Sequence, residues 1–465
     1  MESELALPRC PARLFLVGIG GIGMSALAQL LCWLGYDVAG SDRGIAEPGK
    51  AELYGKLKRL GIRLYPQDGS GVRAEKPQLL VVSTAVEEGN PDFLAGEDIP
   101  RLHRASALSQ ALAMIPGARL IAVGGTCGKT SVTGWLGTAL HELGEKVLVV
   151  NGGYYSDEET LPGNFRADEN PTWLVVEVDE SDKSILTFTP DYGVVLNASN
   201  DHYGVEEMRR VFGCFLERCR LGAVTSRELA GLLPDHLARH ALFDGESCEE
   251  AGIVLPCGYE SGREGIRFEV PAFGTVTTCQ SGRHSAANAC AVLALLSILD
   301  LKASRADLCR AISAFQGIRQ RFELMGNTPD GIPVINDYAH NPEKVAAAIR
   351  TAHERFGHRI LALFQPHGYT PLRNIRTELT QTLAFLMKGT QDTLVMLSVY
   401  YAGGTVQFSP TSAEVAEEMK EAGIQVTACE RSEAEKLAGE GGWDCILVMG
   451  ARDSSLREWS RKMTL

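Results

Sequence analysis

Short apolar runs alternate with longer helical patterns along almost the whole chain. Several runs are continuously apolar, as expected for parallel strands covered on both faces, and helical patterns follow many of them. This alternation predicts an α/β fold built from doubly wound parallel sheets. The predicted strands are residues 14–18, 78–83, 119–124, 146–151, 173–178, 192–197, 359–364, 393–398 and 444–450, and the clearest predicted helices are 23–34, 129–143 and 342–356.

Two breaks divide this pattern. One lies at Ile115-Pro116-Gly117, directly before the strand at 119–124. The other lies at residues 317–321, after helical stretches at 284–299 and 304–315. A chain of 465 residues is also too long for one hydrophobic core. We therefore predict three domains, at residues 1–115, 116–320 and 321–465.

The composition excludes some classes of protein. A net charge of −13 argues against general binding of nucleic acids or membrane surfaces, which a basic excess would favour. Twelve cysteines without metal-ligand spacing predict reduced thiols rather than a zinc site or a disulfide framework. The uncharged stretch 14–36 is long enough to span a bilayer, but its glycines favour a strand, a turn and a helix. With two glutamates where a signal peptide would be basic, we expect a soluble cytoplasmic protein.

The strongest local motif is GGTCGKTS, Gly124 to Ser131, between a predicted strand and a predicted helix. Glycines in such a turn let backbone N–H groups surround phosphate oxygens, and the helix N-terminus adds partial positive charge. Lys129 would neutralise phosphate charge, and Thr130 would offer its hydroxyl to Mg²⁺. The spacing is one residue shorter than in the common phosphate loop, so the motif predicts a variant loop that binds ATP.

Polar side chains follow the next two predicted strands. A nucleotide-bound Mg²⁺ needs a carboxylate, and an acidic turn follows the strand at 173–178; a merely solvated turn is the alternative. Asn200-Asp201-His202 follows the strand at 192–197, at the edge where parallel sheets hold ligands, so His202 is either a ligand or structural. The candidate carboxylates, which the sequence does not rank, are Glu177, Asp179, Glu180 and Asp182.

Two further motifs occupy the ends of predicted strands. GIGGIGMS at 18–25 resembles a dinucleotide loop, with Asp42 at the end of the next strand as a ribose ligand, and predicts a pyrophosphate at a second helix N-terminus. In the third domain, Asp337 and His340 precede a helix that Pro342 opens, with Asn341 as its N-cap. A similar polar cluster, residues 365–369, follows the strand at 359–364.

Together these motifs resemble those of the Mur ligases, enzymes of bacterial cell-wall synthesis. The matching segments lie in all three predicted domains and in the family's order. They are GIGGIGMS (18–25), VVSTAV with NP (81–91), GGTCGKTS (124–131), VVEVDESD (175–182), NDH (200–202), GRHSAANA (282–289), FQGIRQRFE (315–323), NDYAHNP (336–342), FQPHGY (364–369) and VMGARD (448–453).

The resemblance implies a Rossmann-like N-terminal domain that binds UDP, a central P-loop ATPase domain and a Rossmann-like C-terminal domain. It implies a ligase that uses ATP and Mg²⁺ to join an amino acid to the lactyl carboxylate of UDP-N-acetylmuramate through an acyl phosphate. In the branch that this chain resembles most, the amino acid is L-alanine. The implied partners are these small molecules, without nucleic acid or membrane insertion, and the chain is expected to be a monomer or homodimer.

The resemblance also implies the site residues. The catalytic set is Lys129, His202, Arg321 and His340, and the metal set is Thr130, Glu177 and His202. The implied ATP site is Gly125, Thr126, Gly128, Lys129, Thr130, Ser131, Asn288, Arg321 and Asp337. The implied UDP-sugar site is Gly20, Gly21, Ile22, Gly23, Met24, Ser25, Asp42, Ser83 and Thr84, and the implied amino-acid site is His340, His367 and Arg373.

Some positions depart from the family pattern. Several sister ligases hold magnesium with a carbamylated lysine, but no lysine lies between Lys183 and Lys302, which is consistent with the alanine-adding branch. Cys127 stands where the family usually has histidine. The segment 367–371 reads HGYTP where the family has HRY and a nearby arginine. Arg373 is a candidate substitute for the missing arginines. Because those arginines would lie near the incoming amino acid, the sequence leaves the identity of that amino acid open.

Three alternatives remain at the level of sequence. The first is a ligase of the same fold that adds a different amino acid or peptide. The second is an NAD-dependent oxidoreductase, suggested by GIGGIG, which leaves the phosphate loop and the acidic turn unexplained. The third is a degenerate relative that binds a nucleotide as a regulator, against which the intact Lys129, Thr130, Glu177 and His202 weigh.

Overall fold

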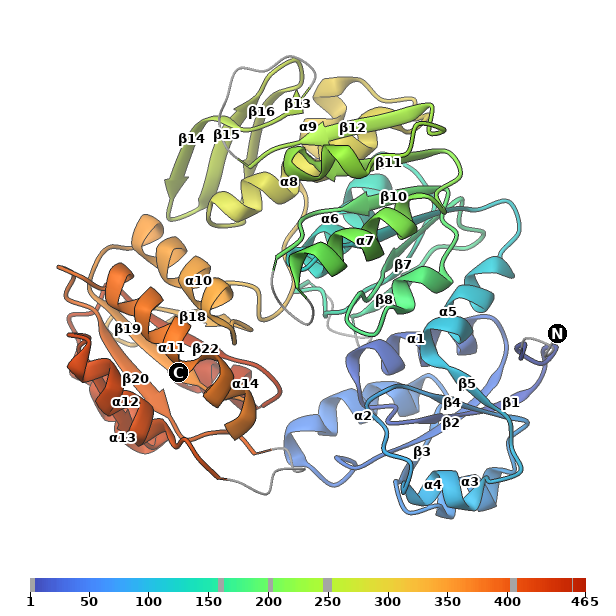
Figure 1. Ribbon diagram of the computed structural model, residues 1–465, viewed down its shortest axis with the longest axis horizontal. Coiled ribbons are helices and arrows are strands. Elements are labelled where there is room, and N and C mark those ends of the chain that lie inside the picture. The colour runs from blue at the N-terminus through green and yellow to red at the C-terminus, as the bar shows by residue number, and fades with distance from the viewer. Residues whose placement is uncertain (1–4, 158–162, 200–203, 246–252, 402–407, 454) are drawn as a thin grey trace. The chain divides into compact units, whose positions relative to one another are not determined.

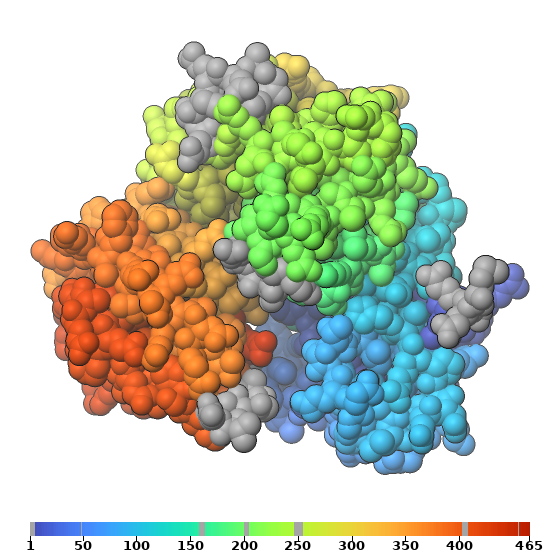
Figure 2. Space-filling model, viewed as in Figure 1, coloured from blue at the N-terminus to red at the C-terminus, as the bar shows by residue number. Residues whose placement is uncertain are grey.

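The computed structural model describes residues 5–157, 163–199, 204–245, 253–401, 408–453 and 455–465. Contacts divide the chain into two compact units. Unit 1 comprises Met1–Tyr259, Arg267–Thr278 and Ala286–Ile318, and unit 2 comprises Glu260–Ile266, Cys279–Ser285 and Arg319–Leu465. Figure 2 shows one face of the chain in a space-filling view.

The first sheet of unit 1 has five parallel strands in the order β3-β2-β1-β4-β5 (Figure 1). The uncharged stretch at 14–36 forms a strand, a glycine turn and a helix, as predicted. In the part of the chain that the structure describes, no helix is long and apolar enough to cross a membrane. The elements are β1 (Arg13–Val17), α1 (Ile22–Trp33), β2 (Asp37–Asp42), α2 (Ala51–Arg59), β3 (Arg63–Pro66), α3 (Ser70–Glu75), β4 (Leu79–Val82), α4 (Pro91–Ala95), β5 (Arg101–His103) and α5 (Arg104–Ala113).

The second sheet of unit 1 has eight strands in the order β13-β12-β11-β10-β6-β9-β7-β8. All its pairs are parallel except β7 with β8, and the phosphate-loop strand β6 lies between β10 and β9. The strands are β6 (Arg119–Gly124), β7 (Val147–Val150), β8 (Phe165–Ala167), β9 (Trp173–Glu177), β10 (Tyr192–Val195), β11 (Gly222–Ser226), β12 (Arg239–Phe243) and β13 (Ile253–Val254). The helices are α6 (Lys129–Glu142), η2 (Ser184–Thr187), α7 (Val205–Leu216), η3 (Arg227–Leu232), α8 (Arg283–Ile298) and α9 (Arg305–Ser313).

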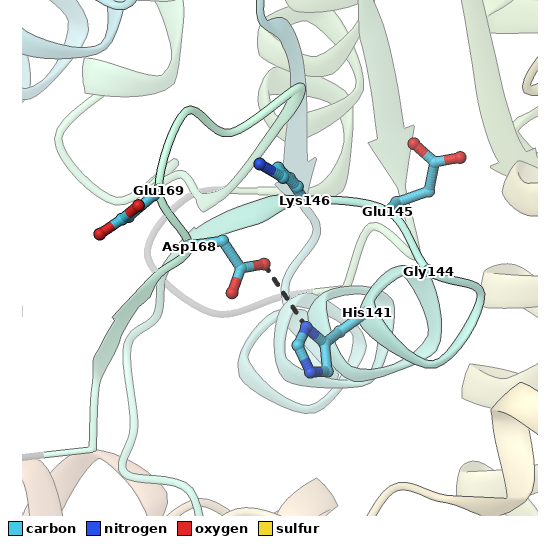
Figure 3. A pocket seen from close by; sticks show the side chains of 6 residues that line it. All are labelled: His141, Gly144, Glu145, Lys146, Asp168 and Glu169. Carbon is cyan, nitrogen blue, oxygen red and sulfur yellow. Dashed lines mark hydrogen bonds and ion pairs between the residues drawn. The ribbon is translucent and has the colours of Figure 1, made fainter.

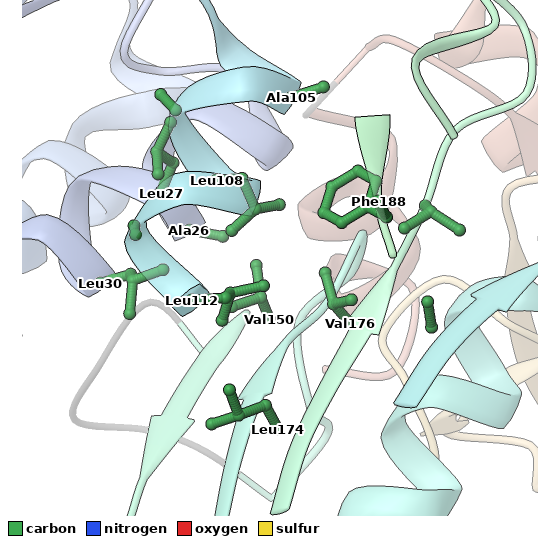
Figure 4. Close-up of a cluster of buried hydrophobic side chains, with 14 of the residues drawn as sticks. Ala26, Leu27, Leu30, Ala105, Leu108, Leu112, Val150, Leu174, Val176 and Phe188 are labelled. Atoms are coloured by element: carbon green, nitrogen blue, oxygen red, sulfur yellow. The ribbon is translucent and has the colours of Figure 1, made fainter. Parts of the chain in front are cut away.

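The two sheets of unit 1 share one hydrophobic core. Leu27 and Leu30 of α1 and Leu108 of α5 belong to the same buried cluster as Val150 of β7 and Val176 of β9 (Figure 4). The boundary predicted at residues 115/116 therefore separates two sheets that are packed together by apolar side chains. The three-domain division itself stays a prediction.

Unit 2 contains a six-stranded sheet in the order β17-β18-β22-β19-β20-β21, parallel except for β17. Asn341 caps α10 by accepting a hydrogen bond from the Lys344 N–H (2.9 Å), with Pro342 at the first helical position, as predicted. The elements are β17 (Glu323–Asn327), β18 (Pro333–Asp337), α10 (Pro342–Arg355), β19 (Ile360–Gln365), α11 (Tyr369–Leu386), β20 (Thr393–Leu397), α12 (Ser412–Glu421), β21 (Val426–Cys429), α13 (Arg431–Gly439), β22 (Cys445–Gly450) and α14 (Ser455–Lys462).

The structure confirms the α/β fold, and each of the nine predicted strands is a strand to within a residue or two at its ends. The sequence did not predict a three-stranded sheet of β14 (Cys257–Gly262), β15 (Gly265–Val270) and β16 (Gly274–Thr278). Burial alternates along β15, from exposed Arg267 to buried Phe268. Such strands contain no continuous apolar run. A continuous apolar run is the pattern that predicts the parallel strands.

Candidate active site

The phosphate loop joins β6 to α6, as predicted. Gly128 immediately precedes α6 with φ of +88°, a conformation that favours glycine. A Cβ at Gly128 would come within 2.8 Å of the Asn288 Oδ1, so the loop has room only for glycine beside that side chain. Asn288, predicted from the resemblance to contact the nucleotide, therefore lies next to the phosphate loop.

Asn197, just beyond β10, fixes the tip of this loop. Its Oδ1 accepts a hydrogen bond from the Cys127 N–H (2.8 Å), and its Nδ2 donates to the Cys127 carbonyl oxygen (3.1 Å). The hydroxyl of Thr126 accepts a further bond from the Ser199 N–H (3.1 Å). Residues that follow β10 thus hold the loop, through the backbone atoms of Cys127 and the hydroxyl of Thr126.

Lys129 is held at the start of α6 by oxygen atoms. Its Nζ donates to the Gly125 carbonyl oxygen (2.6 Å) and to the Glu180 Oε1 (2.8 Å). Burial opposes the charge, but the carboxylates of Glu180 and Glu177 outweigh burial and raise the pKa of Lys129. Lys129 is therefore a cation at neutral pH, and a nearly buried Glu180 balances its charge.

The structure separates the four acidic candidates. Glu177, at the end of β9, accepts a hydrogen bond from the Thr130 hydroxyl (3.2 Å) and another from the Gly152 N–H (2.8 Å). Glu180 pairs with Lys129. Asp179 and Asp182 instead accept hydrogen bonds from nearby backbone N–H groups of Ser181 and Ser184, respectively (2.9 Å each). Of the four, only Glu177 contacts the predicted metal-binding threonine.

Thr130 and Glu177 fit a magnesium ion chemically, because a hydroxyl and a carboxylate oxygen are the hard ligands that Mg²⁺ takes beside phosphate oxygens. The third predicted metal ligand, His202, lies outside the described residues. Among the residues that are described, no group of three His, Cys, Asp or Glu side chains forms a metal site by itself. Nucleotide oxygens would have to complete the coordination.

The N-terminal glycine loop is held by Asp42. The Asp42 Oδ2 accepts a hydrogen bond from the Gly20 N–H (2.8 Å), and its Oδ1 accepts from the Gly44 N–H and the Tyr54 hydroxyl (2.8 Å each). Asp42 ends β2, as predicted, but in this structure its oxygens already hold the loop. Its role as a ribose ligand stays a prediction.

The other predicted UDP-sugar residues lie around the same loop. Gly21 precedes α1, and Ile22, Gly23, Met24 and Ser25 form its first turn. The Ser25 hydroxyl is buried and bonded to the Ile22 carbonyl oxygen (3.0 Å), so we expect it to position the loop. Half-buried Ser83 and exposed Thr84 follow β4, which pairs with β1, and thus leave the same edge of the sheet as the loop.

A residue that the sequence did not indicate connects this loop to the acidic turn. Arg104 begins α5, and its Nη1 lies 2.4 Å from where a Cβ on Gly23 would be, so its guanidinium covers the start of α1. Its Nη2 is 3.7 Å from the Asp179 Oδ2. The neighbouring His103 lies 3.5 Å from the Asp182 Oδ2, and burial lowers the pKa of His103 despite that carboxylate.

In unit 2, Asp337 and Arg321 form a second polar group. Asp337 ends β18 and accepts hydrogen bonds from the Phe322 and Ala339 N–H groups (2.7 Å each). Burial raises the pKa of Asp337, and the charge of Arg321 opposes this effect. The Arg321 guanidinium lies over the Tyr338 ring, 4.8 Å from its centroid.

The structure brings together two of the three residues predicted to bind the amino acid. His340 and His367 are in contact, with ring centroids 5.0 Å apart and perpendicular planes. Burial, and then the charges of Arg452 and Lys344, lower the pKa of His367 to about 4, so it is neutral at pH 7. Arg373, in the first turns of α11, donates to the carbonyl oxygen of Ser409.

A shallow hollow of about 330 Å³ lies elsewhere in unit 1, where α6 ends and β7 begins (Figure 3). His141 and Asp168 line it, 3.4 Å apart. It lies at the amino edge of the second sheet, whereas the phosphate loop and the acidic turn lie at the carboxyl edge, where open α/β sheets bind ligands. We therefore place the active site at the carboxyl edge.

The two features, a phosphate loop with a magnesium-compatible pair and a second glycine loop in the same unit, define an α/β enzyme that binds a nucleotide. Residues 14–115 match the Mur ligase family catalytic domain, and residues 320–452 match the Mur ligase glutamate ligase domain. A UDP-N-acetylmuramate–L-alanine ligase of Streptomyces avermitilis is 32% identical, and the alignment covers 96% of each chain. One of Anaeromyxobacter sp. is 31% identical over 95% of each chain.

Solved structures are similar as well. The UDP-N-acetylmuramate-alanine ligase of Thermotoga maritima superposes with a TM-score of 0.79 at 27% identity, over 97% of this chain and 98% of the other. A murein peptide ligase of Psychrobacter arcticus shares the fold, with a TM-score of 0.67 at 20% identity over 97% of this chain and 98% of the other. The chain belongs to the Mur ligase family. It is an ATP-dependent ligase that forms carbon–nitrogen bonds.

Proposed function

We propose that this enzyme joins L-alanine to the lactyl carboxylate of UDP-N-acetylmuramate in peptidoglycan synthesis. The observation that carries the proposal is the phosphate-loop cluster, in which Lys129 and the Thr130–Glu177 pair lie at the carboxyl edge of the second sheet. Relatives that match almost the whole chain are named for that substrate and amino acid. The second glycine loop, in the same unit, supplies a separate place for the UDP pyrophosphate.

The first chemical step is the activation of a carboxylate. An oxygen of the lactyl carboxylate attacks the γ-phosphorus of ATP, the bond to the β–γ bridging oxygen breaks, and ADP leaves. The product is an acyl phosphate. Lys129 balances the negative charge that gathers on the transferring phosphoryl group, and the backbone N–H groups of the loop that Asn197 fixes hold the phosphates in place.

Thr130 and Glu177 would hold Mg²⁺, together with His202. A bound magnesium ion supplies additional positive charge at the phosphates. The Gly152 N–H keeps the Glu177 carboxylate beside the Thr130 hydroxyl, so both oxygens are positioned before a nucleotide arrives. Asn288, beside Gly128, would contact the adenine. Arg321 and Asp337 remain predicted ATP ligands contributed by unit 2.

The second chemical step forms the amide bond. The amine nitrogen of the amino acid attacks the acyl carbon, a tetrahedral intermediate forms, and inorganic phosphate leaves while the nitrogen loses a proton. His340 and His367 would lie on the amino-acid side. His367 would be neutral there, because its pKa is held at about 4, and would interact with the amino acid by hydrogen bonding rather than by charge. We also infer that the enzyme acts in the cytoplasm, where ATP is available, as a monomer or homodimer.

The proposal is tested by ADP release with UDP-N-acetylmuramate and each amino acid in turn. We expect L-alanine to support the highest kcat/KM, and Mg²⁺ removal by chelation to stop turnover. Lys129→Ala should reduce turnover at least about 1,000-fold, because it removes the cation from the transferring phosphoryl group, with an unchanged circular dichroism spectrum.

Two results would count against the proposal. Turnover that does not depend on UDP-N-acetylmuramate would remove the substrate assignment, and a higher kcat/KM with another amino acid would favour a sister activity. Lys420→Ala is a matched control, because Lys420 is an exposed lysine of unit 2 that forms an ion pair with Glu417 within α12. That variant should retain the turnover of the unmodified enzyme.

A further inference from the structure

Three loops leave the carboxyl edge of the unit 2 sheet side by side. β22 lies between β18 and β19, with Asp337 paired with Met449 and Gln365 paired with Gly450. The loop after β22 therefore emerges between the loop that carries His340 and the loop that carries His367. The contact between the two imidazole rings, at 5.0 Å, shows how close the two outer loops are.

The central loop contains an unusual turn. Arg452 has φ of +67°, and the Asp453 N–H donates to the Ala451 carbonyl oxygen (2.9 Å), which makes a three-residue γ-turn with positive φ. Such turns are rare and strained for residues other than glycine. Arg431 fixes the turn from one side, with its Nη2 2.5 Å from the Asp453 Oδ2 and its Nη1 2.9 Å from the Ser455 Oγ.

The Arg452 side chain itself is exposed, so burial of its apolar part does not account for the strained turn. Strained backbone that the surrounding structure enforces is concentrated at binding sites. The charges of Arg452 and Lys344 both reach His367, as the lowered pKa of that imidazole indicates. Two positive charges, those of Arg452 and Lys344, therefore act at the edge of the sheet beside His367.

The backbone of the His367 loop disfavours an arginine at position 368, where the family has one. Gly368 has φ of +133° and ψ of 151°, a combination that is essentially restricted to glycine. An arginine at position 368 would be strained in this loop. Arg373 already donates to the Ser409 carbonyl oxygen. Arg452 is thus an exposed arginine in the loop that leaves the sheet between the His340 loop and the His367 loop.

We propose that Arg452 is a substrate-binding residue that holds the α-carboxylate of the incoming amino acid. This inference rests on the proposed function, and it assigns to Arg452 the place for which Arg373 was the candidate. A guanidinium presents two parallel N–H donors that match the two oxygens of a carboxylate. The enforced turn fixes the backbone of Arg452 in the central loop, within electrostatic reach of His367 of the predicted amino-acid site.

The test compares Arg452→Ala, Arg452→Lys, Arg373→Ala and Arg350→Ala in the ADP-release assay, with separate KM values for the amino acid, ATP and UDP-N-acetylmuramate. Arg350 is an exposed arginine of α10 and serves as the matched control. We expect Arg452→Ala to raise the amino-acid KM about 30-fold or more, because a charge-assisted bidentate contact is lost, and to change the other two KM values less than about twofold. Arg452→Lys should recover part of the loss.

Arg452→Gly adds a readout that does not depend on turnover. Glycine relieves the positive-φ turn, so this variant should have a Tm about 2 °C higher while its amino-acid KM rises as in Arg452→Ala. An unchanged amino-acid KM in Arg452→Ala overturns the inference, as does a rise confined to Arg373→Ala or to the KM for ATP. If the unmodified enzyme shows no turnover with any amino acid, the proposed function fails. That result differs from the failure of the inference on Arg452 alone, in which the unmodified enzyme is active and the amino-acid KM of Arg452→Ala is unchanged.

Discussion

His367 shows how surrounding charge decides the state of one side chain. Burial, reinforced by Arg452 and Lys344, holds its pKa at about 4, below the 6.5 of an unperturbed histidine. Because the folded state resists the proton that the unfolded chain accepts, the stability linked to His367 is complete above about pH 6.5 and is lost as the pH falls toward 4. The imidazole is thus neutral at pH 7.

His367→Asn should therefore reduce the dependence of stability on pH. Between pH 7 and pH 4.5, the unmodified protein should lose about 2 kcal/mol more unfolding free energy than the variant, as measured by urea denaturation at each pH. His358→Asn, at an exposed histidine of the same unit, is the control and should follow the unmodified protein. Equal pH dependence in all three proteins would show that His367 is not held neutral.

The conformation of the phosphate loop after β6 depends on a residue that follows the neighbouring strand β10. Asn197 lies just beyond β10 and makes two hydrogen bonds with the backbone of Cys127. The Asn197 side chain therefore holds the tip of a loop that is distant from it in sequence. The motif alone predicts the presence of the loop but not this contact, because the two residues are 70 positions apart.

Asn197→Ala should weaken ATP binding without unfolding the protein. Loss of both hydrogen bonds leaves the loop backbone unfixed, and we expect the KM for ATP to rise about 10- to 100-fold while the KM for UDP-N-acetylmuramate stays within about twofold. Asn197→Asp keeps the acceptor for the Cys127 N–H and loses the donor, so its effect should be intermediate. If Asn197→Ala has the same KM for ATP as the unmodified enzyme, Asn197 does not support ATP binding through the loop.

Other elements show where sequence reasoning succeeds and where it stops. The apolar runs, such as those of β9 and β10, are found because burial on both faces leaves few polar positions in them. Polar residues at the ends of these runs, such as Glu177, stand out for the same reason. The pairing of Lys129 with Glu180 depends on the order of strands in the sheet, with β6 beside β9, and no local pattern carries that order. Arg104 gave no signal, because an arginine at the start of a helix is ordinary.

At the scale of the whole molecule, the two sheets of unit 1 are joined by polar as well as apolar contacts. The buried Asn164, next to β8, donates to the Ile22 carbonyl oxygen (2.8 Å) and the Ser25 hydroxyl (2.9 Å), and accepts from the Gln29 amide (2.8 Å). These bonds attach the glycine-loop helix α1 to the second sheet. Since the apolar core is also shared, we expect the two sheets to unfold together.

Asn164→Ala should lower the stability of both sheets by about 2–3 kcal/mol, because it leaves buried polar partners without a hydrogen bond. Native-state hydrogen exchange measures this, as equal losses of protection for amides in β1 and β6. Asn374→Ala, at an exposed asparagine of unit 2, is the control and should change neither strand. Loss of protection in β1 alone would indicate that the first sheet unfolds independently.

The ion pair between Lys129 and Glu180 has a consequence for which anions enter the phosphate loop. The protein places its own carboxylate against the lysine, so an incoming anion meets an internal competitor for that charge. A monoanion offers Lys129 no more charge than this carboxylate does, whereas the linked phosphates of ATP offer several. We therefore expect the loop to favour polyphosphates over abundant small anions, independently of the adenosine.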